Sequence, residues 1–295
     1  MSFQPVEYFK NLLLRAALGA PKLLPYKQRI NTVGWITGRI LAPLAGYNTR
    51  VKNNISYIYP DMDEQDLNRL AYEVPRNAGR TLAEIYSGTA FIDHVKDTPL
   101  TGEGLAALDE AHANNRPIII VTPHFGNYDA LRTVIRLRGH KLGGLYRPMS
   151  NPYFNAHYER KIKAIAAPIF ANTKRGMAGM IKHIRGGNTF LILPDQMVRS
   201  GPLLRFMGKP SYTTLSAAEM ALKYDALLIP IFAPRINNGL DFEVIAHKPI
   251  EHSTAELMSQ QINDVMTGEI DKNLEQWLWV HDRWKNTPTE FPENP

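Results

Sequence analysis

The chain contains no cysteine among its 295 residues, and this excludes several kinds of chemistry. Disulfides, thiolate nucleophiles and cysteine-ligated metal sites all need the missing side chain. The nine histidines show no metal-ligand spacing such as HExxH, so we expect no metal. G-x-S-x-G, P-loop and G-x-G-x-x-G motifs are also missing, which argues against a serine hydrolase, an NTPase or a dinucleotide-binding dehydrogenase. We expect no bound cofactor.

Long hydrophobic runs are missing as well. A helix that spans a membrane needs about 18 consecutive apolar residues. Near the N-terminus, Arg15, Lys22 and Arg39 interrupt the apolar sequence, and prolines between residues 21 and 43 break the helical pattern. The charged region, apolar core and cleavage site of a secretory signal are not recognisable either. The sequence therefore predicts neither a spanning helix nor a signal peptide.

Positive charge is concentrated at the N-terminus. The chain has a formal net charge of +6, and residues 1–53 hold eight basic residues against one acidic residue, so the remainder is close to neutral. These basic residues lie within aliphatic sequence, which favours amphipathic helices at a membrane surface that carries anionic lipid. The alternative is a helical hairpin that covers the core of an ordinary soluble domain. Few aromatic residues accompany the charges, which argues against binding to nucleic acid.

From residue 116 onward, short apolar runs alternate with amphipathic helical segments. The runs expected to be strands are 117–122, 141–147, 167–171, 189–195 and 227–235. Strands separated by helices are typical of parallel βαβ units. We therefore predict an α/β fold with a mixed, mostly parallel sheet flanked by helices, preceded by the amphipathic helical membrane-association region at 1–53. The main domain spans 54–285, and a flexible proline-rich tail spans 286–295.

Three further elements complete the prediction. Residues 64–86 read as a helix, and residues 242–250 read as a late strand, antiparallel at an edge of the sheet. Residues 252–284 read as one long helix, and the stretch that begins at Leu203 reads as an exposed apolar loop.

The segment RPIIIVTPHFGNYD at 116–129 places a histidine and an aspartate directly after an apolar run. On one continuous helix, five residues turn the chain by about 500°, so His124 and Asp129 would point about 140° apart. They meet if His124 lies in the turn after the strand and Asp129 lies in the first turn of the next helix. Gly126 allows such a bend, and Asn127 can cap the helix.

In that arrangement the Asp129 carboxylate would fix the tautomer of the imidazole. The free ring nitrogen of His124 would take a proton from an acceptor hydroxyl, which is general-base chemistry without a protein nucleophile. The crevice beyond the carboxyl ends of parallel strands is also where α/β folds usually bind ligands. The alternative is that His124 only caps a helix or satisfies a backbone carbonyl.

Basic residues follow two other predicted strands. Arg147 comes just after a strand end and is suited to bind a phosphate or carboxylate through two hydrogen bonds, and Arg160 lies on the next helix. Lys174 and Arg175 precede a helix whose first backbone amides would favour an anionic group. For Arg160, Lys174 and Arg175, simple solvation at the surface is the alternative reading.

A polar cluster follows the strand predicted at 189–195. Asp195 and Gln196 come at its end, and Arg199 lies just beyond. Asp195 can position an acceptor or pair with an arginine. The alternative for such a carboxylate at a strand end is a purely structural role.

Several blocks of the chain, in this order, resemble those of the bacterial lipid A late acyltransferases, a branch of the lysophospholipid acyltransferase superfamily. After the basic apolar N-terminus come NNISYIYPDM at 53–62, HFGNYD at 124–129, YRPMSNP at 146–152, PDQMVRSG at 194–201, FMGKPSYTT at 206–214 and QWLWVHDRWK at 276–285. No single block is decisive, but the ordered set is specific.

The resemblance implies an enzyme in which His124 is the general base and Asp129 is its partner. It implies an acyl thioester as donor, on acyl carrier protein or on coenzyme A, and a hydroxyl of a membrane-embedded lipid A precursor as acceptor. Arg147, Arg160 and Asp195 would lie around the site. The protein would then sit on the cytoplasmic face of the inner membrane as a peripheral or monotopic protein, and residues 54–285 would be the acyltransferase domain.

Two departures from the family pattern leave the acceptor open. Many lipid A members carry Glu at the position of Asp129, and an additional basic residue is frequent at the position of Asp282. A glycerophospholipid or ornithine-lipid acyltransferase with the same mechanism is therefore an alternative. A more remote one is a non-enzymatic basic module that binds lipid or nucleic acid.

Overall fold

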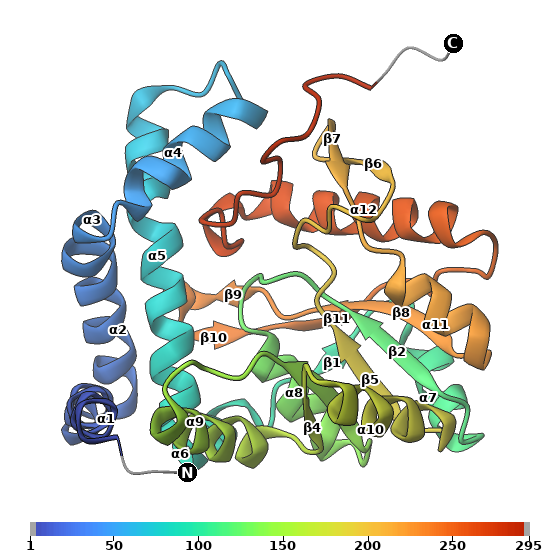
Figure 1. The fold of residues 1–295 in the computed structure, drawn as a ribbon, viewed down its shortest axis with the longest axis horizontal. Helices are drawn as coiled ribbons and strands as arrows, with labels where there is room; N and C mark the ends of the chain where they lie inside the picture. The colour runs from blue at the N-terminus through green and yellow to red at the C-terminus, as the bar shows by residue number, and fades with distance from the viewer. Residues whose placement is uncertain (1–3, 292–295) are drawn as a thin grey trace.

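A central sheet of seven strands organises residues 4–291, which are the residues that the computed structural model describes (Figure 1). The strands, in spatial order, are β1 (Leu100–Thr101), β11 (Val244–Ala246), β8 (Leu227–Phe232), β2 (Ile118–Val121), β5 (Thr189–Ile192), β3 (Leu142–Tyr146) and β4 (Ile169–Ala171). Neighbours pair in parallel, except that β11 is antiparallel to β8. The predicted α/β fold with a mixed, mostly parallel sheet is confirmed.

Helices cover both faces of this sheet. On one face, the core includes residues from α6 (Thr89–Val95), α7 (Leu105–Ala113), α8 (Tyr128–Leu137) and α9 (Pro152–Ile165). On the other, it includes residues from α4 (Tyr47–Ile58), α5 (Glu64–Ser87), α11 (Ser216–Tyr224) and α12 (Ala255–Lys272), with α10 (Lys174–Arg185) beside α11. Strand β2 shows why both layers are needed, because Ile118 and Ile120 face the first core and Ile119 and Val121 face the second.

A layer of N-terminal helices lies outside α5, at the edge of the molecule (Figure 1). It comprises α1 (Pro5–Gly19), the 3₁₀ turn η1 (Ala20–Leu23), α2 (Tyr26–Ile36), the π-helical turn η2 (Thr37–Leu41) and α3 (Ala42–Leu44). The contact with α5 is close, because a Cβ atom at Gly79 would lie 2.3 Å from the Thr37 hydroxyl. The predicted boundary at residue 53 falls inside α4, and the division into domains stays a prediction.

Two predicted segments differ from the structure. Residues 203–212 form a hairpin of β6 (Leu203–Phe206) and β7 (Lys209–Tyr212), and Phe206 is buried, so the prediction of an exposed loop is wrong. The long helix predicted at 252–284 ends with α12 at Lys272. Beyond a short 3₁₀ turn, η4 (Leu274–Gln276), Trp277 has an extended backbone and turns follow from Trp279 onward. Trp277 and Trp279 are both buried, at a two-residue spacing that a helix cannot place on one face.

The late strand β11 is antiparallel to β8 as predicted, but it does not lie at the edge, because β1 pairs with its other side. A small two-stranded sheet of β9 (Arg235–Ile236) and β10 (Asp241–Phe242), joined by η3 (Asn237–Gly239), completes the fold. The predicted tail begins at residue 286, and its residues 292–295 lie outside the described residues.

Candidate active site

The turn after β2 places His124 at the carboxyl edge of the sheet, as the sequence predicts. Strand β2 ends at Val121, and Gly126 has a φ of +56°, a left-handed conformation that favours glycine. A Cβ atom at Gly126 would lie 2.1 Å from the carbonyl oxygen of Ala233. Asn127 then caps α8, because its side-chain oxygen accepts a hydrogen bond of 2.8 Å from the backbone N–H of Asp129.

The carboxylate that contacts the imidazole is Asp195 and not Asp129. His124 Nδ1 lies 2.8 Å from Asp195 Oδ1, and the backbone N–H of His124 donates to Asp195 Oδ2 at 2.9 Å. The indole N–H of Trp277 donates to the same Oδ2 at 2.9 Å. Asp195 follows β5, which pairs in parallel with β2, so the two strands bring their carboxyl ends together. The predicted pairing of His124 with Asp129 is therefore wrong.

Asp129 pairs instead with Arg132, one turn further along α8. Their side chains lie 2.5 Å apart, and Arg132 also donates to the backbone carbonyls of Ile162 and Ala166. Asp129 is only 1% exposed, and its Oδ2 has no hydrogen-bond partner within the protein. Burial raises the pKa of Asp129, although the charge and hydrogen bond of Arg132 oppose that rise.

Burial and the attraction between His124 and Asp195 have opposite effects on the pKa of each side chain. Asp195 is 0% exposed, and burial alone would raise its pKa, but the charge of His124 and the hydrogen bonds from His124 and Trp277 hold that pKa well below its ordinary value. Burial lowers the pKa of His124, yet the charge and hydrogen bond of Asp195 outweigh it and raise the pKa above the ordinary value. An ionised carboxylate accepts only, so the neutral ring carries its proton on Nδ1 and leaves Nε2 free as a base.

Two cavities meet at His124, whose side chain is 23% exposed. The first has a volume of about 260 Å³ and is lined by apolar side chains of α5, including Val74, Leu82 and Ile85. The second has a volume of about 280 Å³ and differs from the first in that charged side chains, Asp129, Arg132 and Arg147, line it together with aliphatic ones such as Ile162, Ile169 and Leu191. The side chains shared by both cavities are His124, Tyr128, Met149 and Tyr158. We name them the apolar cavity and the polar cavity.

The structure places the other predicted binding residues in different surroundings. Arg147 is exposed and lines the polar cavity, whereas Asp195, predicted to contact substrate, lies buried behind His124. Gln196 is exposed and lies 3.2 Å from His281 Nε2. Four further predicted binding residues are exposed and line neither of these two cavities: Arg160, Lys174, Arg175 and Arg199. Substrate binding by these side chains stays a prediction.

Sequence reasoning assigned no role to two residues of the site. The indole N–H of Trp277 donates a hydrogen bond to Asp195, and the ring centroids of His281 and His124 lie 5.4 Å apart. Both belong to the closing block QWLWVHDRWK, which carried the family resemblance but gave no spacing that links it to residue 124. Within residues 4–291, no group of three or more His, Cys, Asp or Glu side chains is placed to hold a metal ion.

Comparison with known proteins identifies the family. The sequence profile described as bacterial lipid A biosynthesis acyltransferase matches residues 2–286. The chain belongs to this family. As a member of it, the protein is an acyltransferase, and the hypothesis of a non-enzymatic basic module is rejected.

The relatives of this acyltransferase are distant but extend over most of both chains. A lipid A biosynthesis acyltransferase of Haemophilus influenzae is 23% identical over 247 residues, which cover 81% of this chain and 78% of the relative. The lipid A biosynthesis lauroyltransferase of Escherichia coli is 24% identical over 255 residues, with coverage of 82% and 80%. The palmitoleoyltransferase of the same organism is 22% identical over 243 residues, with coverage of 80% and 78%.

Proposed function

We propose that this acyltransferase transfers a fatty acyl chain from an acyl thioester to a hydroxyl group of a lipid A precursor, with His124 as the general base. One observation carries the proposal: His124 lies where an apolar and a polar cavity meet, with Nδ1 held by the buried Asp195. The printed names of the relatives, which include a lauroyltransferase and a palmitoleoyltransferase, support a lipid A acceptor and a fatty acyl group.

The proposed reaction needs no protein nucleophile. Nε2 of His124 takes the proton of the acceptor hydroxyl as its oxygen attacks the thioester carbonyl carbon. The carbon–sulfur bond then breaks, and the imidazolium returns the proton to the departing thiolate, so the products are an ester and a free thiol. Asp195 stabilises the imidazolium between the two steps, and general-base catalysis of this kind contributes about 10²- to 10⁴-fold in rate.

The two cavities suggest where the substrates bind. The apolar cavity beside α5 suits the hydrocarbon of the acyl chain, because transfer of apolar surface out of water is favourable. The polar cavity suits the acceptor, since Arg147 is exposed there and can bind an anionic group. In this proposal Asp129 lines that cavity with Arg132 and does not orient the imidazole.

Membrane association is proposed for the N-terminal helices, which carry many exposed apolar side chains. These are Val6, Phe9, Leu12, Leu13, Leu14, Leu23, Leu24, Trp35, Ile40, Leu41 and Leu44. Basic residues such as Lys10, Arg15 and Lys22 lie among them, so this surface matches an interface that carries anionic lipid. Among the residues described, no helix is both long and apolar enough to cross a membrane. We therefore propose peripheral association with the cytoplasmic face of the inner membrane.

The membrane proposal is tested by flotation with vesicles that contain anionic phospholipid. Leu13→Glu should weaken binding because Leu13 is 57% exposed on α1, whereas Leu257→Glu, at a residue 59% exposed on α12, should not. Equal flotation of both variants and the wild type would reject the proposed surface.

The thioester donor is proposed to be acyl carrier protein, with acyl-coenzyme A as the other candidate. Acyl carrier proteins are strongly acidic as a class, and the net charge of +6 favours their approach. A direct comparison of the two donors at matched acyl chains separates them.

The central test replaces His124 with alanine. We expect acyl transfer to a lipid A precursor to fall by at least about 10²-fold, while the melting temperature and vesicle binding are retained. Full turnover by His124→Ala would reject the mechanism. Mass spectrometry of lipids from a deletion strain separates the acceptors: loss of an acyl chain from lipid A supports the proposal, and loss from glycerophospholipids or ornithine lipids supports the alternative that Asp129 leaves open.

A further inference from the structure

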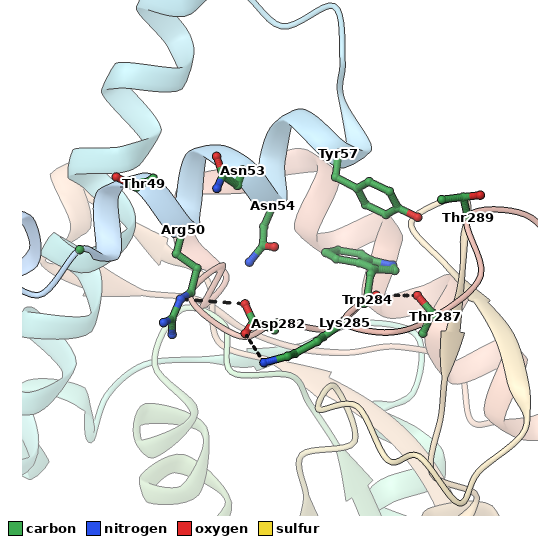
Figure 2. A pocket seen from close by; sticks show the side chains of 11 residues that line it. Thr49, Arg50, Asn53, Asn54, Tyr57, Asp282, Trp284, Lys285, Thr287 and Thr289 are labelled. Carbon is green, nitrogen blue, oxygen red and sulfur yellow. Dashed lines mark hydrogen bonds and ion pairs between the residues drawn. The ribbon is translucent and has the colours of Figure 1, made fainter.

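Two cavities away from His124 have cationic walls, and only one of them supplies its own counter-charge. In the first, of about 670 Å³ between α4 and the C-terminal segment, Arg50 Nε and Lys285 Nζ each lie 3.9 Å from an oxygen of Asp282 (Figure 2). The protein itself therefore provides the anion there. Within residues 4–291, the cations that line the second cavity, of about 340 Å³, form no ion pair.

The second cavity lies between the N-terminal helices and the main domain. Helix α1 packs against α5 and α9, at the lower left of Figure 1. The side chains that line the cavity include Leu12, Arg15 and Leu18 of α1, Lys22 of η1, Tyr86 of α5 and His157 of α9. We name it the cationic cavity.

The cations around this cavity lie close enough to repel one another. Burial lowers the pKa of Lys22, and the charge of Lys161, a hydrogen bond between the two amines and the charge of Arg29 lower it further. Burial also lowers the pKa of His157. The cations that act on His157 in the same direction are Arg15, Lys161, Arg160 and Lys22. No carboxylate opposes either change, so positive charge accumulates here without compensation.

Acidic side chains of α1 and α9 have other partners. Glu7 accepts hydrogen bonds from Lys10 at 2.8 Å and from Asn151 at 2.9 Å, and Glu159 pairs with Lys163. Like charges that are held together without a counter-charge disfavour one another. An anion in the cationic cavity would remove that repulsion and accept charge-assisted hydrogen bonds.

The wall of the cationic cavity also contains an unused hydroxyl group. Tyr86 is only 3% exposed, and its hydroxyl is buried without a hydrogen-bond partner among the residues described. Burial, with a smaller effect of Tyr158, raises the pKa of Tyr86 to about 12, so the hydroxyl keeps its proton. A buried donor left unpaired is unfavourable, and an acceptor from a ligand would stabilise it.

On the side of α1, the cavity is apolar and continues onto an exposed surface. Leu12 lines the cavity and is 42% exposed, and Phe9, three residues before it on the same side of the helix, is 61% exposed. A small phosphate would make no use of this surface. The combination suits an amphipathic ligand, with an anionic group among the cations and hydrocarbon along α1.

We propose that the cationic cavity binds the phosphate group of an anionic phospholipid. The phosphate lies between Lys22 and Lys161, near Arg15, and accepts a hydrogen bond from Tyr86. The hydrocarbon chains lie along Leu12 and the apolar surface of α1. The assignment to a membrane lipid rests on the proposed membrane association, whereas the phosphate site does not.

The cationic cavity shares two helices with the candidate active site. On α5, Ile85 lines the apolar cavity and Tyr86 lines the cationic cavity. On α9, Tyr158 lines both cavities at His124, and His157 lines the cationic cavity. A phospholipid bound here would join α1 to the two helices that form the active site, and binding would stabilise that arrangement.

The test adds phosphatidylglycerol to the full chain in detergent and counts bound lipids by native mass spectrometry. We expect one lipid per chain at low lipid concentration. Lys22→Gln and Lys161→Gln should each weaken binding by about 10-fold, because each removes a charge-assisted hydrogen bond. Neither should lower the melting temperature of the lipid-free protein, since each removes a repulsive neighbour. Tyr86→Phe should also weaken binding.

Lys27→Gln is the matched control. It makes the same change of charge in the N-terminal helices, but Lys27 is exposed on α2 and does not line the cavity, so this variant should bind lipid as the wild type does. Equal affinity of Lys22→Gln, Lys161→Gln and the wild type would overturn the proposal, and so would an equal loss in Lys27→Gln. Unchanged affinity of Tyr86→Phe would overturn the role of the hydroxyl.

Two further outcomes separate the sources of the anion. Glycerol 3-phosphate that binds as tightly as phosphatidylglycerol would overturn the lipid part of the proposal. If Lys22→Gln and Lys161→Gln kept lipid binding and slowed transfer from acyl carrier protein but not from acyl-coenzyme A, the cations would serve that carrier, and the proposal would be overturned.

The lipid count requires neither vesicles nor acyl transfer. A bound lipid without flotation of the protein would support this site and count against the proposed membrane surface alone. Flotation without a bound lipid would count against this cavity alone.

Discussion

The substitution Asp195→Asn tests the site most directly, because the structure determines which way the new amide must face. Oδ2 of Asp195 accepts two N–H groups, from the backbone of His124 and from Trp277. In the variant the amide oxygen must take that position, since the amide nitrogen cannot accept. The NH₂ group then faces Nδ1 of His124 and donates to it, which moves the proton of the neutral ring to Nε2. In that tautomer the imidazole cannot act as a base.

The size of the effect follows from the cost of the opposite orientation. If the amide turned over, both N–H groups would lose their acceptor, at about 1–3 kcal/mol each, so the competent tautomer is disfavoured by about 2–6 kcal/mol. This corresponds to a loss of roughly 30-fold to 10⁴-fold in kcat/KM. A comparable substitution in the triad of a serine protease lowers kcat by about 10⁴-fold.

The pH profile of Asp195→Asn should change as well. The charge of Asp195 raises the pKa of His124, so the activity of the wild type should rise with pH through a value above the ordinary histidine pKa. Without that charge, burial lowers the pKa of His124, and the residual activity of the variant should rise at lower pH. The assay is acyl transfer as a function of pH, together with the tautomer and pKa of His124 from nitrogen NMR.

Asp129→Asn is the matched control, because it makes the same chemical change at the carboxylate that sequence reasoning favoured. It should lower stability, since it leaves Arg132 buried without its partner, but it should not shift the pKa of His124. The reasoning is refuted if Asp195→Asn keeps the kcat/KM of the wild type. It is also refuted if Asp129→Asn shifts the acidic limb of the profile of acyl transfer against pH and Asp195→Asn does not.

Three further outcomes are expected. Trp277→Phe removes a hydrogen-bond donor to Asp195 and should lower kcat/KM by about 10-fold. The indole of Trp279 donates to a backbone carbonyl, so Trp279→Phe should lower the melting temperature and leave kcat/KM unchanged. Equal kcat/KM values for the two variants would contradict this. Arg132→Met should lower the free energy of unfolding by about 3–5 kcal/mol, because it leaves Asp129 buried without its partner. The folded-state pKa of Asp129 then rises further, so the loss of stability measured in thermal melts should be greater at about pH 8 than at about pH 5. Gly126→Ala should lower both melting temperature and activity, because its backbone is left-handed and its Cβ would meet the carbonyl of Ala233; a normal melting curve would argue against that strain.

Local pattern determined the strands and the turn at the site. The run at 117–122 is largely apolar and β-branched, which is typical of a short strand buried on both faces, and Gly126 and Asn127 specify the bend and the cap that follow. The position of His124 at the carboxyl edge of the sheet could therefore be predicted from the sequence. These are short-range effects, in which each residue constrains neighbours a few positions away.

The partner of His124 could not be predicted in this way. Asp129 is five residues away and was the nearest acidic residue after the turn, yet α8 directs it toward Arg132, one turn further along the helix. Asp195, 71 residues from His124, reaches the imidazole because β2 and β5 are neighbours in the sheet, and Trp277 reaches Asp195 from the C-terminal segment. The sequence determined that the proposed base lies at the end of β2, and only the tertiary structure decided which carboxylate contacts it, because strand order is a long-range property that local spacing does not record.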